Sequence, residues 1–70
     1  MVNERLFKVG QKVRWVRAVS DPEYRDAGGI IVAVIEDDRH SRQFSMYDVQ
    51  FEFGLRTLYG TQIEAFEGVL

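Results

Sequence analysis

The sequence predicts an all-β domain built from five short strands. Apolar and polar residues alternate with a period of two along most of the chain, and glycines, aspartates and the single proline separate the alternating runs. The chain has 70 residues, of which 46% are hydrophobic and 13% aromatic, so it can fill one small core. We therefore expect one domain over residues 6–66, with flexible termini at residues 1–5 and 67–70.

The first strand is predicted at residues 11–19. Every second residue there belongs to one mostly apolar face, while Lys12 and Arg14 alternate onto the other face. Residues 20–29 are predicted to form a loop, because they contain the single proline, two aspartates and a pair of glycines, which are all typical turn residues. Ser20, followed three residues later by a glutamate, has the form of a capping box, so this loop has room for a single helical turn.

The next three strands follow from changes in the pattern. Six consecutive apolar residues after the glycine pair predict a strand at residues 30–36 that is buried to some degree on both sides. Unbroken alternation predicts a third strand at residues 45–53. Gly54 interrupts the alternation and residues 55–59 resume it, so the third and fourth strands are expected to form a hairpin.

A fifth strand is predicted at residues 63–66, after a short turn. The alternative is a C-terminal helical turn, because Thr61 and Glu64 have the spacing of a capping box. The alternation also predicts which residues form the core of the domain. These are Val13, Ile30, Val32, Val34, Val49, Phe51 and Ile63.

This order of strands and loops is typical of a small SH3-like barrel, whose closure would remove the exposed sheet edges. The chain resembles Tudor-type and KOW-type small barrels at residues 7–13, 29–34 and 47–51 and at Ile63. The resemblance implies a five-stranded SH3-like (Tudor-like) barrel that serves as a binding module.

Tudor-type domains bind methylated lysine or arginine in an aromatic cage, since a cation is attracted to several ring faces at once. By position, Tyr24 and Phe51 match cage sites, whereas Arg17 and Leu55 occupy positions where further aromatic residues would be expected. The resemblance thus implies an incomplete cage. The alternative interpretation is that the bulky aromatic residues fill the core. These are Trp15, Tyr47, Phe51 and Phe53.

Protein binding is the function that the sequence favours. A barrel of this size has no internal cavity, so we expect a partner at its rim. This rim is made by the first loop (residues 20–29), the polar second loop between the second and third strands, and the turn between the third and fourth strands. Exposed aromatic side chains beside arginine are common at interfaces. The residues expected to carry the contact are Tyr24, Arg25, Phe44 and Phe53.

Nucleic-acid binding is the alternative function. Five of the first 17 residues are basic and one is acidic, and the chain also resembles bacterial barrels appended to helicases and transcription factors, which implies a KOW-like role in transcription or repair. The candidate phosphate contacts are Lys8, Lys12, Arg14 and Arg17. A solvated strand face would explain the same residues. The net charge of −2 excludes a polycation that coats nucleic acid indiscriminately.

Two weaker resemblances involve enzymes. Residues 7–14 and Leu58-Tyr59 resemble the type II dihydrofolate reductases, but their pore motif Val-Gln-Ile-Tyr reads Arg-Thr-Leu-Tyr here, without the glutamine that contacts folate. Residues 7–14, 22–25 and 29–31 are similar to the barrel of nitrile hydratase beta subunits. The second resemblance implies a subunit or maturation partner of a larger enzyme.

We expect no enzymatic activity, no cofactor and no metal site. The one histidine, His40, lies in a charged run without the spacing of a catalytic triad, and the chain has no cysteine. Residues 1–5 form no apolar stretch, so neither a secretory signal nor a membrane span is predicted and a cytoplasmic location is expected. The sequence leaves the oligomeric state open.

Overall fold

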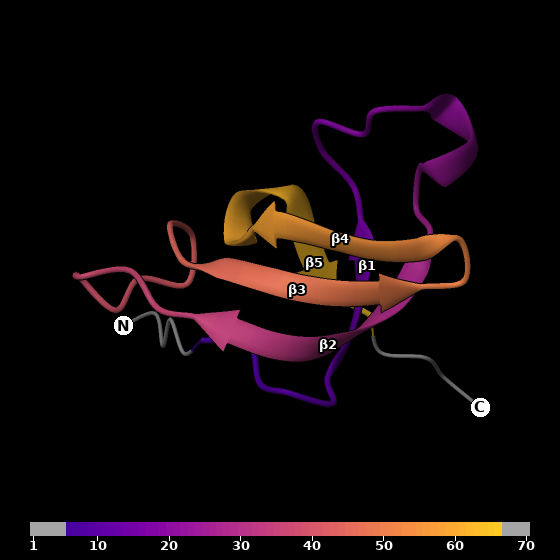
Figure 1. Cartoon of the computed structure of the whole chain (residues 1–70). Coiled ribbons are helices and arrows are strands. Elements are labelled where there is room, and N and C mark those ends of the chain that lie inside the picture. The colour runs from indigo at the N-terminus through magenta and orange to yellow at the C-terminus, as the bar shows by residue number, and fades with distance from the viewer. Residues whose placement is uncertain (1–5, 67–70) are drawn as a thin grey trace.

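A computed structural model describes residues 6–66 and shows one antiparallel sheet of five strands (Figure 1). The strands are β1 (Lys12–Trp15), β2 (Gly28–Ile35), β3 (Met46–Phe51), β4 (Gly54–Tyr59) and β5 (Ile63–Ala65). Two short 3₁₀ turns, η1 (Pro22–Tyr24) and η2 (Gly60–Gln62), lie in the connections. The all-β prediction is confirmed, and no α-helix occurs in residues 6–66. The termini expected to be flexible lie outside the described residues.

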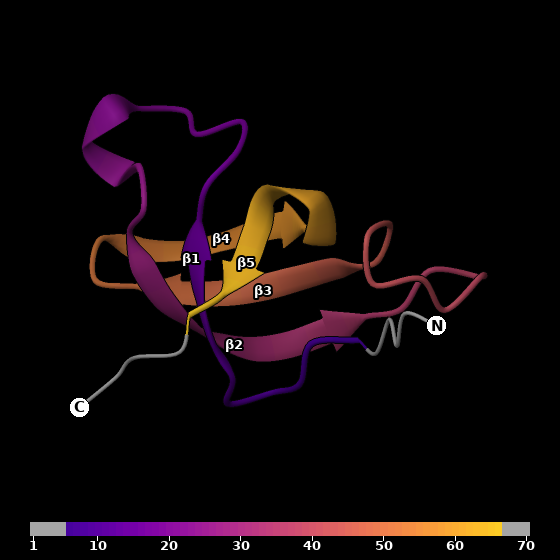
Figure 2. The ribbon, with the colours of Figure 1, turned by 180° about the vertical axis from the view of Figure 1, so that it is seen from behind.

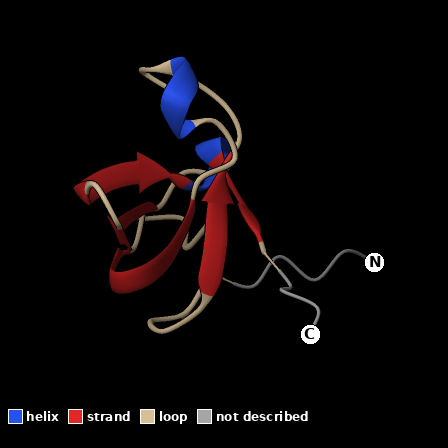
Figure 3. Cartoon of the chain, turned by 90° about the vertical axis from the view of Figure 1, so that its right-hand side faces the viewer, coloured by secondary structure: helices blue, strands red, loops and turns tan. Residues whose placement is uncertain are grey.

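The sheet is curled but open. Its strand order is β4-β3-β2-β1-β5, so β4 and β5 are the two edges. β1 and β5 cross one side of the layer made by β2, β3 and β4, as the views from front and back show together (Figures 1 and 2). The side view shows that the sheet bends around its inner face, with η1 projecting beyond it (Figure 3). The five strands are confirmed, whereas β4 and β5 do not pair to close a barrel within residues 6–66.

The first strand is shorter than its alternation predicts. β1 ends at Trp15 because the chain turns there: the amides of Val16 and Arg17 both donate to the Gln62 carbonyl, at 2.9 and 3.1 Å. Ala18 then adopts a positive φ of 53°, which is incompatible with an extended strand.

Two of the predicted turns differ in detail from those observed. The helical turn in the first loop is confirmed as η1, but its cap is Asp21 rather than Ser20, with the Asp21 carboxylate accepting from the Glu23 amide at 3.2 Å. The hairpin between β3 and β4 turns on Glu52 and Phe53, between the paired Phe51 and Gly54, rather than around Gly54 as predicted. After Gln62 the chain forms β5, so the alternative of a C-terminal helical turn is wrong.

The core lies on the inner face of the curled sheet and is built from every strand. Four of the predicted core residues are buried: Val13, Val49, Phe51 and Ile63. The other buried hydrophobic residues are Phe7, Trp15, Ile31, Tyr47 and Leu58. The burial of Trp15, Tyr47 and Phe51 agrees with their interpretation as core aromatics, and Phe53 packs against this core while half-buried.

The predicted core residues of β2 are partly wrong. Ile30 and Val32 are 40% and 47% exposed, whereas Ile31 between them is fully buried. The pairing with β3 runs from Ile31 opposite Val49 directly to Ala33 opposite Asp48, so Val32 forms a β-bulge without a partner. Beyond the bulge the alternation is shifted by one residue, which brings Val34 inward against the core.

Candidate binding surfaces

Four aromatic side chains form a stack at the hairpin end of β3. Phe51 and Phe53 lie 4.8 Å apart between ring centroids with planes 7° from parallel, and Phe53 lies 3.8 Å from Tyr24 of η1 at 14°. Trp15 flanks the stack, 5.7 Å from Phe51 and 6.2 Å from Tyr24. Tyr24 and Phe53 are its half-buried members, so they cover Trp15 and Phe51 from solvent.

This stack has no open cage for a cation. Tyr24 and Phe53 touch face to face, so a methylammonium group cannot enter between them. The chain also supplies its own cation beside the stack, because the Arg56 guanidinium lies 5.2 Å from the Phe53 centroid and 6.0 Å from that of Tyr24. Arg56 comes from β4, opposite Val49, and therefore belongs to the inner face of that edge strand.

The structure divides the predicted rim into two surfaces. Tyr24 and Phe53 meet, and Arg25 is exposed beside them at the end of η1. Phe44 precedes β3 and thus lies at the opposite end of that strand from Phe53. A six-residue strand rises about 17 Å, so one small contact cannot cover both ends.

Around Phe44 lies an exposed apolar surface that we call the Phe44 patch. Ile35, Met46 and Tyr59 form one row across β2, β3 and β4 on the outer face of the sheet. Ile35, Phe44 and Tyr59 are each about half exposed, at 50%, 47% and 48%. Together with Arg39, whose guanidinium lies 4.4 Å from the Phe44 ring centroid, they line a shallow pocket of about 370 Å³.

The charges beside the Phe44 patch are paired with one another. Asp37 accepts from both the amide and the Nε of Arg39, each at 3.0 Å, and these bonds hold the pKa of Asp37 below its usual 3.8. His40 Nδ1 lies 3.2 Å from the Glu36 carboxylate. The apolar side chains are therefore what this surface offers to a partner. Among residues 6–66, no group of three His, Asp or Glu side chains gathers in a way that could hold a metal ion.

The four predicted phosphate contacts do not form one surface. Lys12 and Arg14 lie on the outer face of β1, where Arg14 pairs with Glu64 at 3.5 Å. Lys8 precedes β1 on an exposed turn. Arg17 follows β1, and its Nη1 donates to the Thr61 carbonyl at 3.0 Å.

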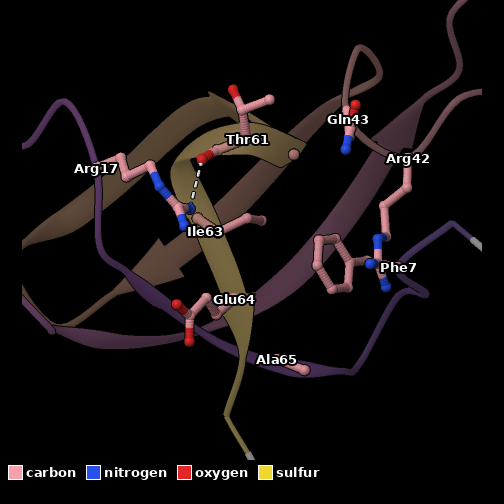
Figure 4. Close-up of a pocket in the computed structure, with 9 residues that line it drawn as sticks. Phe7, Arg17, Arg42, Gln43, Thr61, Ile63, Glu64 and Ala65 are labelled. Carbon is pink, nitrogen blue, oxygen red and sulfur yellow. Dashed lines mark hydrogen bonds between the residues drawn. The ribbon is translucent and has the colours of Figure 1, made fainter. Parts of the chain in front are cut away.

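Arg17 instead faces a second arginine across a pocket of about 640 Å³ beside β5 (Figure 4). Arg42 lies on the other side of β5 in this view, with its guanidinium 5.0 Å from the Phe7 ring centroid. Ile63 and Ala65 of β5 also line this pocket, which we call the β5 pocket. The sequence pattern did not single out Arg42, because it lies in a polar loop far from Arg17 in the chain.

No protein-family model, curated protein or solved structure matches this chain significantly. In the part of the chain that the structure describes, no helix has the length and apolar character needed to cross a membrane. The surfaces described above are therefore the basis for assigning a function.

Proposed function

We propose that this chain is a non-enzymatic protein-binding module with an SH3-like, Tudor-like or KOW-like topology, acting in the cytoplasm. Support for the topology comes from the strand order β4-β3-β2-β1-β5, the curl of the sheet and the 3₁₀ turn between β4 and β5. The resemblance of residues 7–13 to Tudor-type and KOW-type barrels points the same way.

The observation that carries the binding function is the Phe44 patch. Its large apolar side chains are about half exposed and adjacent, and contiguous exposed apolar surface on a soluble domain typically marks an interaction site. Arg39 lies over the Phe44 ring, and aromatic and arginine side chains are the residues most enriched at interface hot spots. The partner that fits is a protein that inserts an aliphatic or aromatic side chain between Phe44 and Tyr59.

Nucleic acid is a poorer occupant of this surface. Its binding depends on clustered unpaired cations, whereas Arg39 is bound to Asp37 and the surface around Phe44 also carries Glu36. Of the predicted phosphate contacts, Arg14 is paired with Glu64 and Arg17 lies beside β5, away from Lys12. Nucleic-acid binding thus remains the alternative function, and the two differ in their dependence on salt.

The test compares three forms of the full chain: the wild type, Phe44→Ala and Leu55→Ala. Leu55 is a matched control, since it is 50% exposed and lies at the other end of the same sheet face. Each form is immobilised and exposed to extract, and one protein retained by the wild type is then purified for titration calorimetry. We expect Phe44→Ala to weaken its binding at least about tenfold and Leu55→Ala to change it less than about threefold.

Salt then separates the two functions. Between about 50 mM and about 300 mM salt, binding at an apolar patch should weaken only about threefold, whereas phosphate contacts would lose about a hundredfold or more. Equal binding by Phe44→Ala and wild type would overturn the proposal, as would a steep salt dependence accompanied by retained nucleic acid.

A further inference from the structure

The two edges of the sheet are not equivalent. In an antiparallel pair, the backbone groups of alternate residues point towards the neighbouring strand. In β4 the even-numbered residues point towards β3, because the Gly60 amide, next in the same register, donates to the Ser45 carbonyl at 3.1 Å. The odd-numbered residues of β4 therefore direct their backbone groups away from β3. Two of these outward groups are taken by the chain's own side chains. Arg56 Nη1 donates to the Leu55 carbonyl at 2.9 Å, and the Tyr59 amide donates to Gln62 Oε1 at 3.0 Å.

Both ends of the β4 edge are therefore protected against pairing with another strand. Arg56 adds to this protection because a charge on the inner side of an edge strand opposes the docking of a further strand.

The β5 edge lacks such protection. Two hydrogen bonds show which residues of β5 and its flanks point towards β1. The Val16 amide donates to the Gln62 carbonyl and the Phe66 amide donates to the Lys12 carbonyl, both at 2.9 Å. The even-numbered residues thus face β1, which leaves the N–H and C=O groups of Ile63 and Ala65 directed away from the sheet. Within residues 6–66, no strand pairs with these groups, because β5 is an edge of the sheet.

The outward groups of β5 lie along the β5 pocket, whose walls carry positive charge. Arg17 and Arg42 stand on opposite sides of β5, and neither has a carboxylate within 4.0 Å among the described residues (Figure 4). Ala65 adds exposed apolar surface, next to the buried Phe7 and Ile63. The one acidic residue of the pocket, Glu64, is already paired with Arg14.

We propose that β5 binds an extended acidic segment of a partner protein as a sixth strand. An added strand lies about 4.8 Å from its neighbour, so its backbone can pair with Ile63 and Ala65 while one carboxylate extends to Arg42 on that side and another extends across β5 towards Arg17. Arginine holds carboxylates through paired N–H donors, which gives the site its preference for acidic side chains. A nucleic-acid backbone lacks the N–H groups that the carbonyls of Ile63 and Ala65 would accept from.

Hydrogen exchange of the full chain, followed by NMR, tests this site with two peptides. The probe is acetyl-TEVETE-amide and its neutral control is acetyl-TQVQTQ-amide. With the acidic peptide, the amides of Ile63 and Ala65 should exchange about tenfold more slowly, while the Glu64 amide, already bonded to β1, should not change. The neutral peptide should bind about tenfold more weakly.

Three variants separate the backbone pairing from the charge recognition. Arg17→Gln combined with Arg42→Gln should weaken binding of the acidic peptide about tenfold or more, and Arg25→Gln, outside the pocket, should leave it unchanged. Ala65→Pro should abolish binding and keep the fold, because the lost N–H points away from β1. If Ala65→Pro does not fold, the wild type alone tests the backbone pairing: the peptide must slow amide exchange at Ile63 and Ala65 and leave Glu64 unchanged.

Several results would overturn the inference. These are the absence of acidic-peptide binding, equal affinity for the neutral peptide, protection that does not alternate along β5, and tighter arginine-dependent binding of a thymidine hexanucleotide. The Phe44→Ala variant should bind the acidic peptide normally, so failure of this site and failure of the Phe44 patch are distinguishable.

Discussion

Tyr24 and Phe53 stack face to face, with ring centroids 3.8 Å apart, and this contact fastens the first loop to the β3–β4 turn. The pair lies between solvent and the buried Trp15, which is 6.5 Å from Phe53. Of the two predicted cage positions, Tyr24 is therefore part of this cover, whereas Phe51 is buried in the core beneath it.

The first prediction concerns the stability that this cover provides. Phe53→Ala should lower the free energy of unfolding by about 2 kcal/mol, less than for a fully buried phenylalanine because Phe53 is half-buried. Urea unfolding followed by the fluorescence of Trp15, the single tryptophan, measures the change. Phe44→Ala is the control and should cost less than about 0.5 kcal/mol. If Phe53→Ala and Phe44→Ala lower the free energy of unfolding equally, Phe53 does not stabilise the fold more than the exposed Phe44 does.

The second prediction tests the bulge in β2 with two adjacent residues. Ile31→Ala should lower the free energy of unfolding by about 2 to 5 kcal/mol, because Ile31 is fully buried in the core. Val32→Ala should cost less than about 1 kcal/mol, since Val32 is 47% exposed and unpaired in the ladder. Thermal unfolding of both variants measures the difference. A larger loss for Val32→Ala would show that the alternation of β2 runs without a bulge.

This bulge marks where sequence patterns stop being informative about the fold. In β3, polar residues at positions 48 and 50 identify the outer face, so the inner residues Val49 and Phe51 were predictable. Residues 30–35 contain no polar residue that would identify a face, and neither the face of Ile30 nor the extra residue at Val32 could be deduced. Closure of the barrel likewise depends on whether β4 and β5 pair, which short alternating segments do not encode.

The same limit applies to the binding surfaces. Phe44 was identified because the alternation does not require its burial, but its neighbours Ile35 and Tyr59 come together only through the register of three strands. Arg42 and Arg17 are brought to one pocket by the curl of the sheet, for which the local pattern carries no signal. Whether Tyr24, Arg25, Phe44 and Phe53 bind a partner stays a prediction.

The third prediction concerns the close approach of η2 to the second loop. A Cβ atom at Gly60 would overlap the backbone carbonyl of Arg42, which cannot move without disturbing the loop. Gly60→Ala should therefore cost about 3 kcal/mol or more, a large part of the stability of a domain of this size. The control is Gly28→Ala, whose Cβ would meet the Phe66 ring at an ordinary 3.7 Å, and it should cost less than about 1 kcal/mol. Chemical denaturation that ranks the two variants in reverse would contradict this packing.

The last prediction is a loss of stability at alkaline pH that depends on Tyr47. Burial raises the pKa of Tyr47 above its usual 10.0, and its hydroxyl donates to the Arg42 carbonyl at 3.2 Å. The folded chain thus holds this proton more tightly than the unfolded chain, so the stabilisation is complete below pH 10.0 and is lost as the pH rises towards the folded pKa.

Tyr47→Phe should lower the free energy of unfolding by about 1 kcal/mol at neutral pH, because the hydrogen bond is lost. Between about pH 9 and about pH 11, the free energy of unfolding of this variant should fall less than that of the wild type. Unfolding free energies across this range measure the difference, which should narrow as the pH rises because only the wild type still has the Tyr47 proton to lose. The matched control is Tyr59→Phe, at a half-exposed position on β4, which should follow the wild-type profile. If the gap between Tyr47→Phe and the wild type stays constant with pH, the Tyr47 hydroxyl does not couple its ionisation to folding.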